Sequence, residues 1–278
     1  MSRPATFSPP SGVSSRVLPT ARGEFAALDT GAGPRGTVLL VPGYTGSKED
    51  FISLLPPLAE AGYRAVAVDG RGQYESPWGS GELAYSRAEL AADLLAQAAA
   101  LDTPLHLVGH SLGGQISRAA VLTDPAPFRT LTLMSSGPAE ISPDQQDRVK
   151  LLQDALAAMP MDAVWEAIQA TGTPEDTETD SAALRARWLR NDPRQLIATG
   201  HQLRTEPDLV DALAAVGLPL HVLSGETDDT WPVPWLDAMA ARLSARRTAV
   251  PGADHSPNTD RPAATAAALL AFFAAHPA

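Results

Sequence analysis

The chain has 278 residues, which suits one large domain or a domain with an insertion. Its net charge of -11 argues against a nucleic-acid partner, and the absence of cysteine excludes disulfides, a thiolate nucleophile and a cysteine-based metal site. The sequence has neither an apolar run near the ~20 residues of a membrane span nor the apolar stretch of a signal peptide, so we expect a cytoplasmic protein.

Strands and helices are predicted to alternate in the first half of the chain. Residues 1–22 are rich in proline and serine and predict a loosely ordered arm. Helical patterns follow Ser47 and Ser86, whose side chains can cap a helix, and a further helix is predicted over 115–122. Short apolar runs predict the strands, over 23–30, 37–41, 64–69, 105–108 and 130–134. This alternation predicts right-handed βαβ units and a mostly parallel sheet.

The alternation stops between residues 137 and 217. Helical patterns cover 143–159, 162–171, 181–189, 193–203 and 207–216, and the acidic run 174–180 predicts a solvated loop. A helical insertion after a strand predicts a cap over the carboxyl ends of the strands, where open α/β sheets bind ligands. Strands at 218–224 and 247–250 and helices at 233–243 and 262–275 then resume the pattern. The predicted architecture is an α/β core, residues 23–136 and 218–278, with a helical cap at 137–217.

The stretch Gly109-His110-Ser111-Leu112-Gly113 joins the predicted strand 105–108 to the helix that follows. It matches the nucleophile-elbow pattern G-x-S-x-G, in which a sharp strand-to-helix turn exposes the serine hydroxyl. Side chains at Gly109 and Gly113 would collide across such a turn. Ser111 is therefore the candidate nucleophile, the alternative being a structural serine on a glycine-rich turn.

A serine nucleophile needs a base within hydrogen-bond reach and a third group that orients the base. Asp228 and His255 follow the predicted strands 218–224 and 247–250, so both lie on loops at the same sheet edge as Ser111. Asp229 is the main alternative acid because it is adjacent to Asp228, and Glu140 is a more distant one. The predicted chemistry is acyl transfer to water, with His255 as the base.

The chain resembles α/β-hydrolase-fold serine hydrolases over residues 23–136 and 218–278. The resemblance rests on the elbow, on Gly225 followed by Asp228, and on Gly252 followed by His255. It implies an oxyanion hole made by the backbone N–H groups of Leu112 and Tyr44. Pro42-Gly43 stands where the family usually has His-Gly, which removes a side chain that often braces this loop. Residues 69–76 resemble a family loop that is more often structural than catalytic.

These patterns together predict a cofactor-free and metal-free serine hydrolase that cleaves a small-molecule carboxylic ester. A thioesterase, lactonase, aminopeptidase, C–C hydrolase or perhydrolase could use the same triad, and a non-catalytic ligand-binding protein could keep the same fold. Tyr44 is a candidate substrate contact, and His110 is expected to point away from the reaction. Candidate pocket residues in the cap are Met159, Met161, Trp165 and Trp188, the alternative being that they only pack between helices. The sequence leaves the oligomeric state open.

Overall fold

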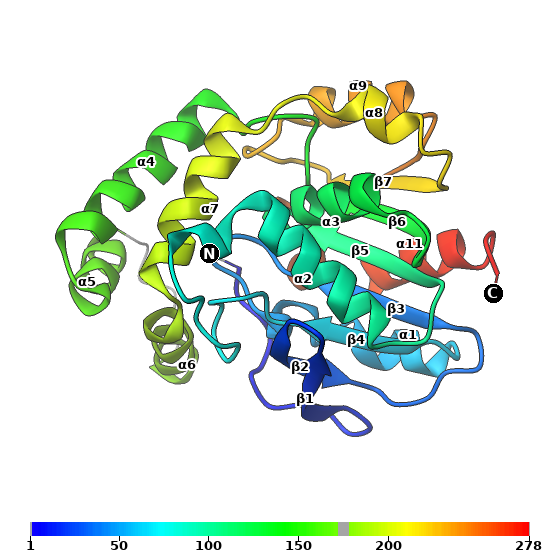
Figure 1. Cartoon of the computed structure of the whole chain (residues 1–278), viewed down its shortest axis with the longest axis horizontal. Helices are drawn as coiled ribbons and strands as arrows, with labels where there is room; N and C mark the ends of the chain where they lie inside the picture. The colour runs from blue at the N-terminus through cyan, green and yellow to red at the C-terminus, as the bar shows by residue number, and fades with distance from the viewer. Residues whose placement is uncertain (1, 172–177, 278) are drawn as a thin grey trace.

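The computed structural model describes residues 2–171 and 178–277, and its centre is an eight-stranded sheet (Figure 1). The strand order within these residues is β1-β2-β4-β3-β5-β6-β7-β8. Pairing is antiparallel for β1–β2 and β2–β4 and parallel for every later pair. The strands are β1 (Ser14–Thr20), β2 (Gly23–Asp29), β3 (Thr37–Val41), β4 (Arg64–Val68), β5 (Leu105–His110), β6 (Phe128–Met134), β7 (Leu220–Gly225) and β8 (Arg246–Val250). The predicted α/β class and mostly parallel sheet are confirmed.

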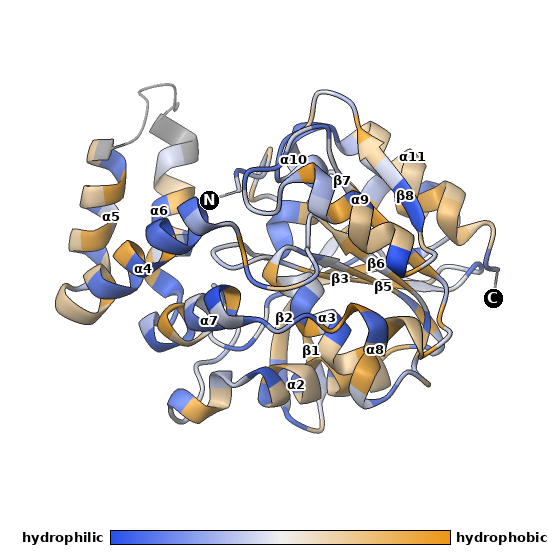
Figure 2. Ribbon diagram, turned by 90° about the horizontal axis from the view of Figure 1, so that it is seen from above, coloured by the Kyte–Doolittle hydropathy of each residue, from blue (hydrophilic) through white to orange (hydrophobic). Residues whose placement is uncertain are grey.

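Helices cover both faces of this sheet. One face packs against α2 (Arg87–Ala99), α3 (Leu112–Thr123), α8 (Val210–Ala214) and α9 (Val233–Arg242). The other packs against the short 3-10 helix η1 (Lys48–Phe51), α1 (Leu55–Glu60) and α11 (Pro262–Phe273). Central strands such as β3 and β5 are buried along their whole length, which explains the continuous apolar run in β3 (Figure 2).

The N-terminal arm departs from the prediction, because residues 14–20 form strand β1 and pair with β2 in register from Ser14–Asp29 to Thr20–Gly23. Only Leu18 of this strand is buried, so the sequence lacks the alternation that marks a half-buried strand. As an edge strand, β1 leaves most of its side chains in water. The prediction of a loosely ordered arm was therefore wrong for residues 14–20.

Five helices lie between β6 and β7 in the described residues: α4 (Pro143–Ala158), α5 (Met161–Thr171), α6 (Glu178–Arg190), α7 (Pro193–Thr205) and α8. Helices α4 to α7 extend beyond the carboxyl ends of the strands (Figure 1). Helix α8 differs from them, since Val210 and Leu213 pack into the core beside the sheet. Residues 174–177 of the acidic run lie outside the described residues.

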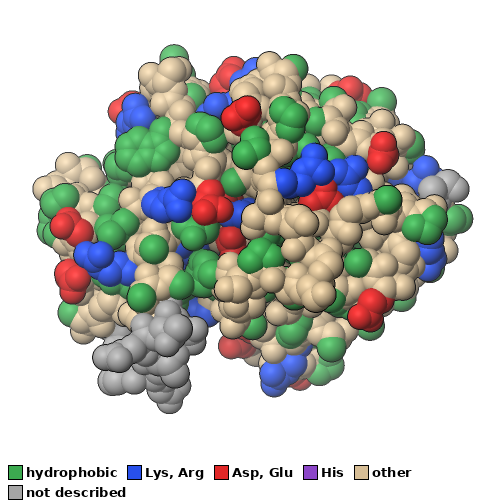
Figure 3. All heavy atoms as spheres, turned by 90° about the horizontal axis from the view of Figure 1, so that it is seen from below, with side chains coloured by type: hydrophobic (Ala, Val, Ile, Leu, Met, Phe, Trp, Pro, Cys, Tyr) green, Lys and Arg blue, Asp and Glu red, His purple; other side chains and the backbone are tan. Residues whose placement is uncertain are grey.

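The surface mixes both charge signs. On the face drawn in Figure 3, acidic and basic side chains stand among one another, so this face has no broad area of one charge. Among the described residues, no helix combines the length and the apolar character that crossing a membrane requires.

Candidate active site

Ser111 lies at a sharp turn between β5 and α3. Its backbone angles are φ 54° and ψ -120°, a left-handed conformation that costs free energy in a residue with a Cβ. A Cβ on Gly109 would lie 2.4 Å from the Gly113 carbonyl oxygen, and one on Gly113 would lie 2.4 Å from the Val41 carbonyl oxygen. Both glycines are thus required by close backbone packing, as the motif predicts.

Three of the predicted site residues meet at the carboxyl edge of the sheet. The Ser111 Oγ lies 3.1 Å from Nε2 of His255, and Nδ1 of His255 lies 3.0 and 3.1 Å from the two carboxylate oxygens of Asp228. Because a carboxylate can only accept, Nδ1 of a neutral His255 carries the hydrogen. Nε2 is then free to accept the Ser111 hydroxyl hydrogen, which is the arrangement that a general base requires.

The two adjacent aspartates have different surroundings. The Asp228 side chain is buried, and its Oδ1 also accepts the backbone N–H groups of Thr230 (2.9 Å) and Trp231 (3.1 Å). The Asp229 side chain is 67% exposed and accepts a hydrogen bond from Nε2 of Gln145 on α4 at 2.6 Å. Glu140, the third candidate, has an exposed side chain. Of the three, only Asp228 contacts the His255 ring in the described residues.

The loop after β3 packs directly against the nucleophile. A Cβ on Gly43 would lie 3.2 Å from the Ser111 Cβ, so the Tyr44 N–H follows a residue in contact with Ser111. Leu112 opens α3, whose N-terminus favours negative charge. Within the described residues, no hydrogen bond occupies the N–H of Tyr44 or of Leu112. Both groups are therefore available to an oxyanion that forms next to Ser111.

Gln73 holds the loop after β3 by a hydrogen bond, at the place where the sequence has Pro42 and the family usually has a histidine. Its Nε2 donates to the Gly43 carbonyl at 2.8 Å, and its Oε1 accepts the Gly70 N–H at 2.9 Å. Sequence reasoning missed Gln73 because the contact joins two loops 30 residues apart. Its place in the family-like loop 69–76 was the one available signal.

A cavity of about 340 Å³ opens beside Ser111 and His255. Its walls come from the loop after β3, from the acid loop and from cap residues on α4 and α7 that include Gln145, Arg148 and Leu203. Tyr44 lines the cavity as expected, but its hydroxyl donates to the Leu196 carbonyl of α7 at 2.7 Å. Burial raises the pKa of Tyr44, so the phenol stays protonated.

The aromatic residues predicted to line the pocket do not reach it. Trp165 and Trp188 are buried in a hydrophobic cluster between cap helices, and the Trp188 indole donates to the Met161 carbonyl at 2.7 Å. Met161 packs against the same cluster, and Met159 is 40% exposed. Their assignment as pocket residues was wrong, because apolar spacing on a helix does not distinguish packing against another helix from lining a cavity.

His110 also differs from the prediction, since it does not point away from the site. It lines the cavity, and its buried Nε2 lies 2.9 Å from the His255 carbonyl oxygen. Desolvation lowers the pKa of His110 to about 4, so the ring is neutral at pH 7. Nε2 therefore carries the hydrogen and donates to the carbonyl, which links the residue before the nucleophile to the backbone of the base.

Comparisons with known proteins place the chain among hydrolases. A 2-hydroxy-6-oxononadienedioate/2-hydroxy-6-oxononatrienedioate hydrolase of Burkholderia vietnamiensis is 31% identical over 226 residues, 74% of this chain and 75% of the relative. A pimeloyl-[acyl-carrier protein] methyl ester esterase of Aeromonas hydrophila is 31% identical over 245 residues, 84% and 92% of the two chains.

Solved structures agree on the fold. An esterase of Exiguobacterium antarcticum superposes with a TM-score of 0.77 at 20% identity, over 94% of this chain and 100% of that one. A family model of the alpha/beta hydrolase family matches residues 38–268. Fold, sheet order and sequence relatives thus agree, and the chain belongs to the alpha/beta hydrolase family.

Proposed function

We propose that the protein is a serine hydrolase that cleaves carboxylic esters through an acyl-Ser111 intermediate. The observation that carries this proposal is the continuous hydrogen-bonded series from Ser111 Oγ through His255 to the buried Asp228 carboxylate, at the wall of a cavity. Each partner comes from the end of a different strand, so the sheet itself holds the three side chains together. This arrangement supplies a nucleophile, a base and a group that orients the base.

The proposed reaction begins when Ser111 Oγ attacks the ester carbonyl carbon and its proton passes to Nε2 of His255. The carbonyl oxygen becomes an oxyanion, which accepts hydrogen bonds from the N–H groups of Leu112 and Tyr44. The carbon–oxygen bond to the alcohol then breaks, and His255 returns its proton to the departing oxygen. Water repeats the same steps on the acyl-Ser111 ester. Throughout, Asp228 holds Nδ1–H and stabilises the imidazolium.

The cavity supports a substrate of modest size. Its volume of about 340 Å³ is near the lower end of the ~300–1,000 Å³ range of small-molecule sites. Apolar groups such as Val149 and Leu203 line one part, and Gln145 and Arg148 line another. We therefore propose that esters with short acyl groups react faster than long-chain ones. A cytoplasmic location stays a prediction from the sequence.

Hydrolytic carbon–carbon cleavage is the second candidate. The Burkholderia vietnamiensis relative, which is named for dienedioate and trienedioate substrates, favours it, whereas the Aeromonas hydrophila relative is named as a methyl ester esterase. Ester cleavage has the stronger support because that second relative matches a larger share of both chains. Thioesterase, lactonase, aminopeptidase and perhydrolase activities stay alternative predictions.

A fluorophosphonate probe tests the proposal, because it reacts covalently with activated serine hydroxyls. We expect rapid labelling of the folded protein, and none of the Ser111→Ala variant. Rates with p-nitrophenyl acetate, butyrate and laurate then give the acyl preference, and 2-hydroxy-6-oxononadienedioate tests the carbon–carbon reaction. A wild-type protein that is neither labelled nor active on any of these esters would contradict the serine-esterase proposal and favour a ligand-binding role.

A further inference from the structure

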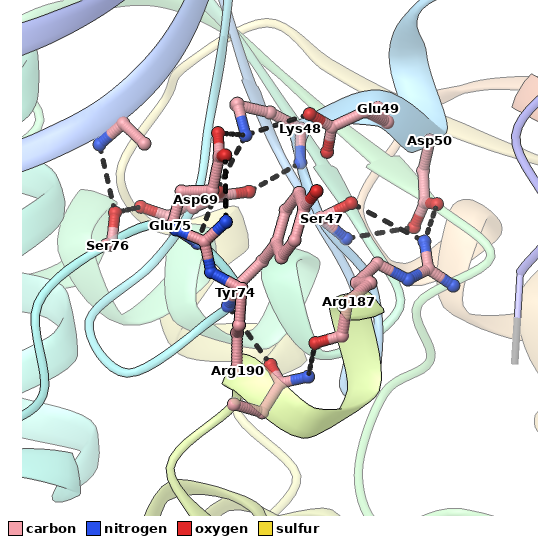
Figure 4. Close-up of polar contacts among 12 residues, drawn as sticks. Ser47, Lys48, Glu49, Asp50, Asp69, Tyr74, Glu75, Ser76, Arg187 and Arg190 are labelled. Carbon is pink, nitrogen blue, oxygen red and sulfur yellow. Dashed lines mark hydrogen bonds and ion pairs between the residues drawn. The ribbon is translucent and has the colours of Figure 1, made fainter. Parts of the chain in front are cut away.

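A buried ion pair connects the cap to the loop that carries the Tyr44 N–H. Nη1 of Arg187, on α6, lies 2.7 Å from Oδ1 of Asp50, on η1, and both side chains are fully buried (Figure 4). The two residues are 137 positions apart in the chain. η1 begins four residues after Tyr44, so this pair reaches the candidate oxyanion loop from the cap.

The Asp50 carboxylate packs against the turn that follows Tyr44. Its second oxygen, Oδ2, accepts the Ser47 N–H at 3.3 Å, and a Cβ on Gly46 would lie only 2.3 Å from that oxygen. The Arg187 guanidinium also lies 3.4 Å from the Ser47 Oγ. Gly43, Tyr44, Thr45 and Gly46 all line the cavity, so the Asp50 carboxylate contacts a segment of the cavity wall.

The Arg187–Asp50 pair also forms hydrogen bonds with Ser2 and with Asn258. Nη2 of Arg187 donates to the Ser2 carbonyl at 2.6 Å, and the Ser2 hydroxyl donates to Asp50 Oδ2 at 2.5 Å; Ser2 is itself a cavity residue. On the other side, Nδ2 of the buried Asn258 donates to the Asp50 carbonyl at 2.8 Å. Asn258 lies on α10 (Pro257–Asp260), directly after the His255 loop.

The cap holds the oxyanion loop at two points. The Tyr44 hydroxyl bonds to the Leu196 carbonyl of α7, and Asp50 bonds to Arg187 of α6. The backbone N–H of Tyr44 belongs to the first of these two residues. An oxyanion hole contributes to catalysis only when its donors are fixed before the charge forms. Contacts from the cap are well placed to provide that fixation.

We propose that Arg187 is a positioning residue, which holds the oxyanion loop through Asp50 so that the Tyr44 N–H faces the oxyanion on the Ser111-bound carbon. This inference rests on the proposed serine-hydrolase function and adds a requirement to it. The oxyanion hole is complete only when α6 is docked on η1. The cap therefore serves the chemical step as well as the shape of the pocket.

The competing explanation is that the pair only stabilises the fold. Removing one partner of a buried ion pair leaves the other charge unpaired in the interior, which is strongly destabilising. Replacing both partners by neutral residues is often tolerated. The double variant Asp50→Asn with Arg187→Met therefore separates the two explanations, because it removes the connection without leaving a buried charge.

We expect the double variant to fold, as measured by circular dichroism and thermal unfolding, and to be a poor catalyst. The kcat for p-nitrophenyl acetate should fall about 10²-fold with little change in KM, the scale of loss for a misplaced or missing oxyanion donor. A trifluoromethyl ketone, which forms a tetrahedral oxyanion on the serine, should bind more weakly by a similar factor. Fluorophosphonate labelling should slow in parallel.

Arg190→Met is the matched control. Arg190 lies on the same helix three residues further on, and its 3.3 Å ion pair with Glu75 is partly exposed and lies away from the cavity. We expect wild-type kcat and ketone affinity from this variant. If the double variant does not fold, Arg187→Lys replaces it in the comparison with Arg190→Met. A lysine keeps the positive charge but cannot bond to the Asp50 carboxylate and the Ser2 carbonyl through two separate nitrogens.

A folded double variant with wild-type kcat and ketone affinity would overturn the role of Arg187 and leave the proposed function intact. Failure of the proposed function itself has another signature. It would show as no labelling of the wild-type protein, or as ester hydrolysis that survives Ser111→Ala.

Discussion

Asp228 and Asp229 are adjacent in the chain, but the Asp228 carboxylate contacts the catalytic-base candidate His255 and the Asp229 carboxylate contacts the cap. Asp228 turns inward and contacts Nδ1 of His255 at 3.0 Å, whereas Asp229 turns outward to Gln145 of α4 at 2.6 Å. The Asp229 carbonyl accepts a further hydrogen bond from the Ser142 hydroxyl at 2.8 Å, just before α4. One loop thus orients the base with its first aspartate and contacts the cap with its second.

This division predicts unequal effects of two matched substitutions. Asp228→Asn should lower kcat by about 10⁴-fold, because an amide can stabilise the wrong tautomer of His255. Asp229→Asn alters solvent-exposed contacts with Gln145 and Arg148 at the cavity wall but none with His255, so it should cost no more than about fivefold. Steady-state hydrolysis of p-nitrophenyl acetate measures both. A larger loss for the Asp229 variant would transfer the role of the acid to that residue.

The elbow glycines give a prediction about stability. Gly113→Ala places a methyl group 2.4 Å from the Val41 carbonyl oxygen, and we expect the free energy of unfolding to fall by about 1–3 kcal/mol or more. Gly81→Ala is the control, because Gly81 has extended backbone and no atom of the described residues lies within 4 Å of the added Cβ. Urea denaturation of the two variants checks this. Equal midpoints would show that the elbow can relax around the methyl group.

The sequence predicts the elbow and its partners because each residue is marked by a local strand-to-loop pattern, although Ser111 and His255 are 144 positions apart. Ser111, Asp228 and His255 each follow a short strand, and parallel strands bring their carboxyl ends to one edge of the sheet. The positions of the strands are therefore enough to predict that the three residues lie close together, and the structure places them within hydrogen-bond distance.

The features that escaped prediction depend on long-range packing. Arg187 and Asp50 are charged residues of a common kind, and nothing near either one in sequence indicates that both become buried. Trp165 has the spacing of a packed helix face, which is the same whether the face meets a cavity or another helix. Strand β1 carries one buried side chain, so hydrophobic periodicity gives it no signal.

Buried histidines predict a loss of stability in acid. Desolvation lowers the pKa of His221 to about 3, against an ordinary value of 6.5. Between pH 6.5 and about 3 the unfolded chain therefore binds a proton at this position while the folded protein does not. The free energy of unfolding should fall as the pH drops through this window and should be unaffected by His221 above it.

The variant His221→Asn tests this, because asparagine cannot take up the proton. Its unfolding free energy should fall less steeply with acidification than that of the wild type, measured by urea denaturation at several pH values between 7 and 4. The exposed His201 provides the control, and His201→Gln should follow the wild-type curve. Identical slopes for all three proteins would rule out His221 as a source of the acid sensitivity.

Both ends of the cap insertion bind to one buried arginine on the elbow helix. Nη1 of Arg118 donates to the carbonyls of Gly137 (3.1 Å) and Pro138 (2.9 Å), and Nη2 lies 2.8 Å from the buried Glu206 carboxylate. Residues 137 and 138 follow β6, and Glu206 follows α7. Arg118 therefore joins the two ends of the segment that carries α4 to α7, together with the hydrogen bond from the Ile141 N–H to the Leu203 carbonyl at 3.0 Å.

The variant Arg118→Met should accordingly be destabilised by about 3–5 kcal/mol. It leaves two carbonyls without their donor, and among the described residues it leaves the buried Glu206 paired with Arg87 alone. The exposed pair of Lys150 and Asp154 on α4 is the control, and Lys150→Met should cost less than about 1 kcal/mol. Urea midpoints at unchanged m-value report both differences. A similar, small change for the two variants would mean that the cap stays docked through its contacts with the oxyanion loop, without support from Arg118.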